Sequence, residues 1–196
     1  PSSFLPPQTF NVDSGTYTFS NDIQVPMYYS FTKDGNGTLV LTGDNLINAG
    51  THVNGGTLVN NGTLTSVMDV KAGGIYAGTG VFNGGVGVKG GLLVAGGDMT
   101  INGVLDQANL STTMFELGST LNVQSLSPNG MVSIVGLGEN YVAPGTQRLV
   151  NTQAFAPTNR HSLSEWVSNG RYDDLVFDAS LFLRGELAYS ATTVDV

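Results

Sequence analysis

The side chains most often used in catalysis and metal binding are few and far apart in this sequence. The chain contains two histidines, His52 and His161, and no cysteine, which excludes a thiolate nucleophile and a cysteine-ligated metal. His52 lies in a short β-type run, where we expect a surface ladder position, and His161 lies beside Arg160 in an irregular stretch, where we also expect it at the surface. We therefore expect no catalytic residue, no metal site and no cofactor, and we do not expect this chain to be an enzyme.

The carboxylates offer no better arrangement for chemistry. Asp173 and Asp174 are the only adjacent acidic pair, and neighbours on a strand face opposite sides, so they cannot act on one glycosidic bond. The run Gly96–Asp98 is similar to one step of a calcium-binding repeat. A single step without tandem copies cannot supply the six to eight oxygen ligands that Ca²⁺ takes.

The charge of the chain limits its partners. Lys and Arg number 7 against 15 Asp and Glu, which gives a formal net charge of −8, and the basic residues are scattered. Without a basic stripe the chain cannot neutralise a row of phosphates, so we exclude nucleic acid, and an anionic membrane surface would repel it. Its apolar stretches are too short for a transmembrane helix. The first residues do not form a signal peptide, and we interpret the start as a cut from a longer protein.

Internal repetition predicts the architecture. Thr38–Gly43 recurs as Thr57–Gly62, 19 residues later, and Val70–Gly74 recurs as Val88–Gly91, 18 residues later. The β-type runs between these repeats are short, and most end at Gly-Gly or Asn-Gly pairs, too frequently for an antiparallel meander. Three short strands in a repeat of about 20 residues instead predict an all-β fold, a parallel β-helix. We expect it to be right-handed, as parallel crossovers are.

We divide the chain into two regions of one continuous domain. Residues 1–131 are predicted to be β-helix coils, beginning with an aromatic-rich region at 10–31. Residues 132–196 are predicted to form a C-terminal cap, in which 162–167 could form one short helix. An open solenoid end needs such a cover because it exposes backbone groups and core. The residues predicted to build the cap are Trp166, Leu175, Phe177, Leu181, Leu183, Leu187 and Tyr189.

Several runs resemble one family. Lys33–Asn45 (KDGNGTLVLTGDN) and Ala49–Val59 (AGTHVNGGTLV) resemble the passenger-associated repeat of bacterial type V autotransporters, and Gly73–Gly80 and Met99–Gly103 are similar to the runs that follow it there. The chain departs at 46–51, where the family commonly has a Tyr-x-Gly-Gly-Thr run. Two looser matches exist: 187–189 resembles the end of the family's stem, and 17–23 resembles a segment that follows a subtilisin-like protease domain in some members.

The resemblance implies a mechanical function. It implies that the chain is the structural stem and autochaperone-like end of a passenger, which supports passenger folding and translocation across the outer membrane. Its partners would be its own C-terminal β-barrel and the N-terminal passenger of the full-length protein, with host surface molecules as a further candidate. The implied location is the bacterial cell surface or outer membrane, or the secreted fraction.

Two alternatives remain open. An adhesin or binding module on a β-helix would present a row of exposed aromatic side chains, for which the cluster at 10–31 is the only candidate. A β-helical polysaccharide enzyme would need a groove lined by clustered Asp, Arg and Lys, and the sequence does not indicate such a cluster.

Overall fold

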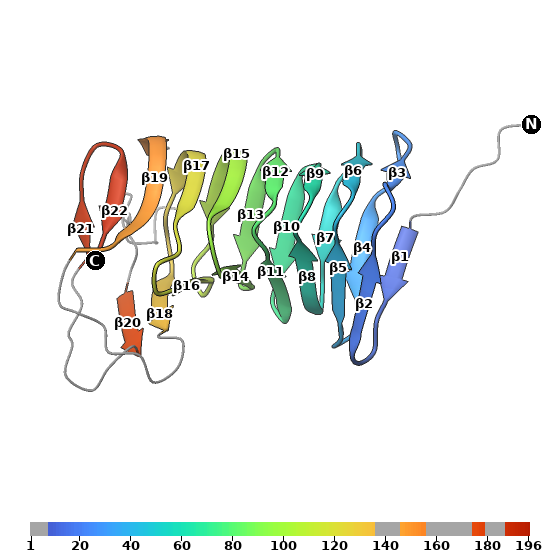
Figure 1. Ribbon diagram of the computed structural model, residues 1–196, viewed down its shortest axis with the longest axis horizontal. Coiled ribbons are helices and arrows are strands. Elements are labelled where there is room, and N and C mark those ends of the chain that lie inside the picture. Colours follow the sequence, from blue (N-terminus) through green and yellow to red (C-terminus); the bar gives the residue numbers. More distant parts are fainter. Residues whose placement is uncertain (1–7, 136–145, 156–173, 179–186) are drawn as a thin grey trace, which may run out of the picture.

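Short parallel strands stack along one long axis (Figure 1). The computed structural model describes residues 8–135, 146–155, 174–178 and 187–196. The strands of these ranges wind into a β-solenoid of about seven turns, and no helix occurs among them. The predicted parallel β-helix is therefore confirmed.

Each early turn of the chain contributes one strand to each of three stacks. The first stack consists of β1 (Gln8–Asn11), β4 (Phe31–Asp34), β7 (Thr51–Val53), β10 (Met68–Lys71) and β13 (Val86–Lys89). The second consists of β2 (Thr16–Phe19), β5 (Thr38–Leu41), β8 (Gly56–Asn60), β11 (Gly74–Ala77), β14 (Leu92–Ala95), β16 (Thr112–Glu116), β18 (Met131–Val135) and β20 (Asp174–Asp178). The third consists of β3 (Gln24–Val25), β6 (Asp44–Ile47), β9 (Thr63–Thr65) and β12 (Val81–Asn83).

Three longer strands join the first and third stacks. They are β15 (Met99–Gln107), β17 (Leu121–Ser127) and β19 (Arg148–Phe155). The first half of β15 pairs with β12 and its second half pairs with β13, so one strand crosses the bend between the two stacks. The register shifts between Ile101 and Val104, where Asn102 and Gly103 form that bend.

The register of the strands reproduces the repeat of the sequence. Thr38 pairs with Thr57, and Val70 pairs with Val88. Both predicted offsets are therefore the lengths of one turn of the solenoid.

Alternate residues of the strands build one continuous core. In β5 the buried residues are Leu39 and Leu41, and Leu39 stacks on Leu58 of the next turn, which stacks on Tyr76. Burying a Leu or Val side chain stabilises the fold by about 1.5–3 kcal/mol, so these interior columns supply most of the favourable free energy. The Tyr76 ring also meets Phe82 edge to face, with ring centroids 5.9 Å apart.

Close backbone approach between successive turns explains why glycines recur at the bends. Gly84 has φ 143°, and a Cβ there would overlap the carbonyl oxygen of Ser66 on the preceding turn. At Gly62 a Cβ would overlap the Gly43 carbonyl in the same way. Turns can therefore stack at sheet spacing only where these bends carry no side chain.

The parallel order ends near the C-terminus. β17 pairs with β19 and β18 pairs with β20 in parallel, but β22 (Thr193–Asp195) lies antiparallel on β19. β21 (Ala188–Tyr189) then pairs antiparallel with β22 at the end of the solenoid (Figure 1).

Candidate functional site

The C-terminal end is held by the antiparallel pair β19–β22. Val150 and Val194 face each other across this pair and are both fully buried. The backbones of Gln147 and Val196 exchange two hydrogen bonds of 2.7 and 2.9 Å. The Arg148 guanidinium Nε lies 2.5 Å from a carboxylate oxygen of Asp195. These contacts fasten the last strand to the last complete turn.

The residues predicted to build the cap fall into three groups. Leu187 and Tyr189 are partly buried and pack against the core. Leu175 and Phe177 lie in β20, where their backbones pair with Val132 and Ile134 of β18. The other predicted cap residues, Trp166, Leu181 and Leu183, lie outside the described residues, as does the short helix expected at 162–167.

A buried lysine near the start of the chain was not foreseen. Lys33 is fully buried in β4, and its ammonium Nζ donates hydrogen bonds to the carbonyl oxygens of Asp34 at 2.7 Å, Gly35 at 2.9 Å and Gly55 at 3.1 Å. Burial lowers the pKa of Lys33, against the raising effects of Asp34 and Asp13. The run Phe31-x-Lys33 could have indicated that Lys33 is buried, because alternation places it on the same side of the strand as the apolar Phe31.

His52 occupies the predicted ladder position. It lies beside Asp69 of the next turn, with its Nδ1 3.9 Å from a carboxylate oxygen, and Lys89 Nζ lies 2.7 Å from the other oxygen of Asp69. All three side chains are partly exposed. Among the described residues, no group of three His, Asp or Glu lies close enough to hold a metal ion. His161 and Asp173 lie outside the described residues.

The N-terminal aromatic cluster packs mainly into the solenoid. The rings of Phe10 and Phe31 stack with centroids 5.0 Å apart, and Phe10 meets Phe19 edge to face at 6.1 Å. Tyr17 and Tyr28 are the exposed members, at 53% and 90%. The cluster therefore forms the first layer of the core rather than the exposed row expected of an adhesin.

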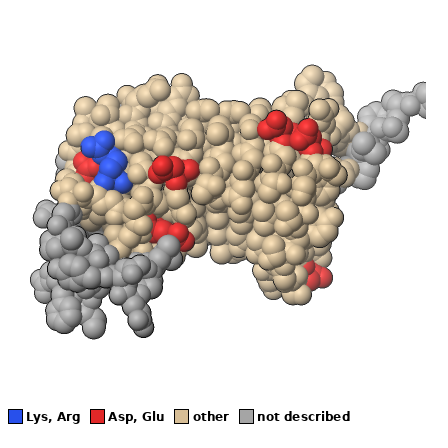
Figure 2. All heavy atoms as spheres, in the orientation of Figure 1, with Lys and Arg blue, Asp and Glu red and all other residues tan. Residues whose placement is uncertain are grey.

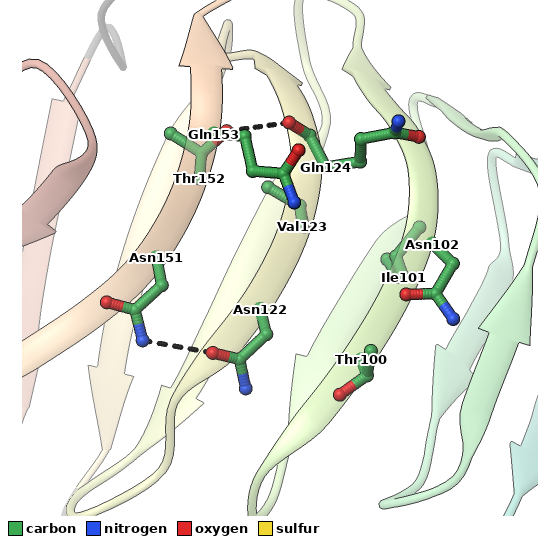
Figure 3. Close-up of a pocket in the computed structure, with 9 residues that line it drawn as sticks. All are labelled: Thr100, Ile101, Asn102, Asn122, Val123, Gln124, Asn151, Thr152 and Gln153. Atoms are coloured by element: carbon green, nitrogen blue, oxygen red, sulfur yellow. Dashed lines mark hydrogen bonds between the residues drawn. The ribbon is translucent and has the colours of Figure 1, made fainter.

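A shallow hollow with a volume of about 430 Å³ lies where β15, β17 and β19 run side by side (Figure 3). Its polar side chains come from three neighbouring strands of the sheet and carry no charge: Thr100, Asn102, Asn122, Gln124, Asn151, Thr152 and Gln153. Asn151 Nδ2 donates to Asn122 Oδ1 at 2.9 Å, which orients both amides along the sheet. The hollow was not predicted, because the pairing of β17 with β19 brings its residues together.

The amides of the hollow retain unused hydrogen-bonding groups. Gln124 and Gln153 are exposed, and their side chains make no hydrogen bond to any described residue. Asn102 donates through Nδ2 to Asn83 Oδ1 at 2.8 Å, which leaves its own Oδ1 atom available. Such an array can donate and accept hydrogen bonds but can neither transfer protons at neutral pH nor ligate a metal strongly.

Charged side chains are sparse on the surface. Figure 2 shows a face on which most described side chains are uncharged and the charged ones gather in a few small groups. Within the described ranges there is no helix that could cross a membrane. In comparisons with known proteins, neither a family model nor a curated protein matches this chain.

Proposed function

We propose that this chain is the structural stem of a type V autotransporter passenger and that its C-terminal end supports passenger folding and translocation across the outer membrane. The observation that carries the proposal is the antiparallel pair β19–β22, which ends a parallel ladder running through every earlier turn. The motif resemblance at 33–45 and 49–59 supports the same assignment.

The stacking of turns in a solenoid gives folding a direction, from the C-terminal end toward the N-terminal end. Each turn contacts mainly its neighbours, so a new turn orders a short segment and gains ladder hydrogen bonds and buried core at once. A turn already fixed by β22 would serve as the template for the turn before it. A passenger that emerges C-terminus first would then fold outside the cell without an external energy source. This chain would fold next to its outer-membrane domain, and the N-terminal passenger would fold after it. The location we propose with this function is the bacterial cell surface or outer membrane, or the secreted fraction.

A surface-display experiment tests the proposal. The chain is placed between a reporter and the outer-membrane domain of an autotransporter, and reporter display is measured in a Gram-negative bacterium. Val194→Asp puts an unpaired charge at a buried position of β22, which costs several kcal/mol, and we expect it to reduce display strongly. The neighbouring Thr192 is exposed, so Thr192→Asp is the matched control and should display as the wild type does.

A third variant separates a template from general destabilisation. Leu58 is fully buried in a middle turn, and Leu58→Asp should disturb nearby turns while β19 and β22 still form. We expect a smaller loss of display than for Val194→Asp. Equal losses, or undisturbed display of Val194→Asp, would contradict the proposed role of the C-terminal end.

A further inference from the structure

We propose that the hollow on β15, β17 and β19 binds a neutral, unbranched oligosaccharide through its amide side chains (Figure 3). The binding groups are Asn102, Asn122, Gln124 and Gln153. This inference goes beyond the stem function and is independent of it, because it concerns the outer surface of the solenoid and not its folding.

The chemistry of the lining matches sugar hydroxyls. A primary amide presents a carbonyl acceptor and an NH₂ donor side by side, and two adjacent hydroxyls can satisfy both, since each hydroxyl donates and accepts. Gln124 and Gln153 offer complete amides, Asn122 keeps its Nδ2 group, and Asn102 keeps its Oδ1 atom. The hollow therefore presents both donors and acceptors within a short distance.

The spacing of these groups suits a chain molecule. Gln124 and Gln153 occupy matching positions on neighbouring strands, because Val123 pairs with Thr152 and Ser125 pairs with Ala154. Neighbouring strands of a sheet lie about 4.8 Å apart, so similar groups recur at that interval along the axis of the solenoid. An unbranched oligosaccharide lying along this axis would contact the amide side chains of one strand after another.

The uncharged lining of the hollow and the negative charge of the chain favour a neutral ligand. No charged side chain lines the hollow, and the nearby Arg148 forms an ion pair with Asp195 while its Nη1 donates to Asn151 Oδ1 at 3.1 Å. The chain as a whole has a net charge of −8, which disfavours acidic polysaccharides and nucleic acids.

The same surface is poorly suited to a peptide. β15 and β17 each have a partner strand on both sides, so they offer no free edge for an added strand. The hollow also lacks the aromatic side chains or deep apolar pockets that anchor protein partners.

Calorimetric titration of the purified chain with cellohexaose, maltohexaose and mannohexaose tests the inference, with hexagalacturonate as the acidic comparison. We expect at least one neutral hexasaccharide to bind and to shift side-chain amide signals in two-dimensional NMR spectra. The double variant Gln124→Ala/Gln153→Ala removes two exposed amides and should weaken this binding at least about tenfold. Gln24→Ala is the matched control, because Gln24 is an exposed glutamine of β3 in the same sheet and outside the hollow.

Each contrary outcome is decisive. The inference is wrong if no neutral hexasaccharide binds, if only hexagalacturonate binds, or if the double variant binds as the wild type does. A second variant, Gln124→Glu/Gln153→Glu, retains the size of the side chains but replaces both NH₂ donors with charge, and it should lose binding equally. Circular dichroism of all variants verifies that the solenoid is intact. Failure of this experiment would leave the display result untouched, because Gln124 and Gln153 contribute nothing to the core.

Discussion

Lys33 Nζ lies 3.1 Å from the carbonyl oxygen of Gly55, one turn further along the solenoid. The ammonium also binds the carbonyl oxygens of Asp34 and Gly35 at its own bend. One buried side chain therefore fastens two successive bends to each other. The positive charge replaces its lost hydration with three carbonyl dipoles, so its burial depends on all three contacts.

Replacing this lysine should weaken the fold. Lys33→Met keeps an unbranched apolar stem of similar length but leaves three carbonyl groups without the ammonium. We expect the free energy of unfolding to fall by about 2–4 kcal/mol, measured by urea denaturation. Asp69→Asn is the control, since it breaks a partly exposed ion pair with Lys89 and should cost under about 1 kcal/mol. Similar losses for both variants would show that Lys33 is not the stronger contact.

The lowered pKa of Lys33 gives a second expectation. Because burial makes the folded-state pKa lower than the unfolded value of about 10.4, the unfolded state binds more protons between these two values. The contribution of Lys33 to stability should therefore rise with pH toward about 10.4. The difference in unfolding free energy between wild type and Lys33→Met, measured at stepwise pH from neutral upward, isolates this effect. If this difference shrinks with rising pH, the predicted direction of the pH dependence is wrong.

Tyr76 should respond to alkali in the opposite direction. Burial raises the pKa of its phenol, and a hydrogen bond from Asn60 only partly opposes the rise. Above the ordinary tyrosine value of about 10 the unfolded chain loses this proton while the folded chain keeps it, so stability must fall as pH rises. We expect Tyr76→Phe to reduce that alkaline loss. Parallel denaturation curves at pH values on either side of the ordinary value provide the measurement, and identical alkaline losses would contradict it.

Two glycines separate backbone strain from crowding. Gly84 and Gly118 both have positive φ, but a Cβ on Gly84 would overlap the Ser66 carbonyl, whereas one on Gly118 would have nothing within 4 Å. Gly118→Ala should therefore cost about 1–3 kcal/mol from strain alone. Gly84→Ala should cost clearly more, because adjacent turns must move apart. Thermal unfolding of the two variants decides the point, and equal shifts would mean that stacking tolerates the methyl group.

The repeating part of the fold could be predicted because its determinants are local. Glycines at tight bends and alternation within short strands recur at a fixed interval, so the offset from Thr38 to Thr57 gave the length of a turn directly. Lys33 was missed because its residue type normally indicates a surface, and only its place in the alternation indicated the interior. The hollow was missed for another reason: Gln124 and Gln153 become neighbours only through the pairing of β17 with β19.

The strands at the C-terminus also affect self-association. In the fourteen-stranded sheet, β22 lies antiparallel on β19 and is followed by β21, which has only two residues. A long unprotected edge would template pairing with another molecule, but an edge this short offers few backbone groups to a newcomer. Among the described residues, this sheet therefore ends in a two-residue edge that offers little to a strand of another molecule.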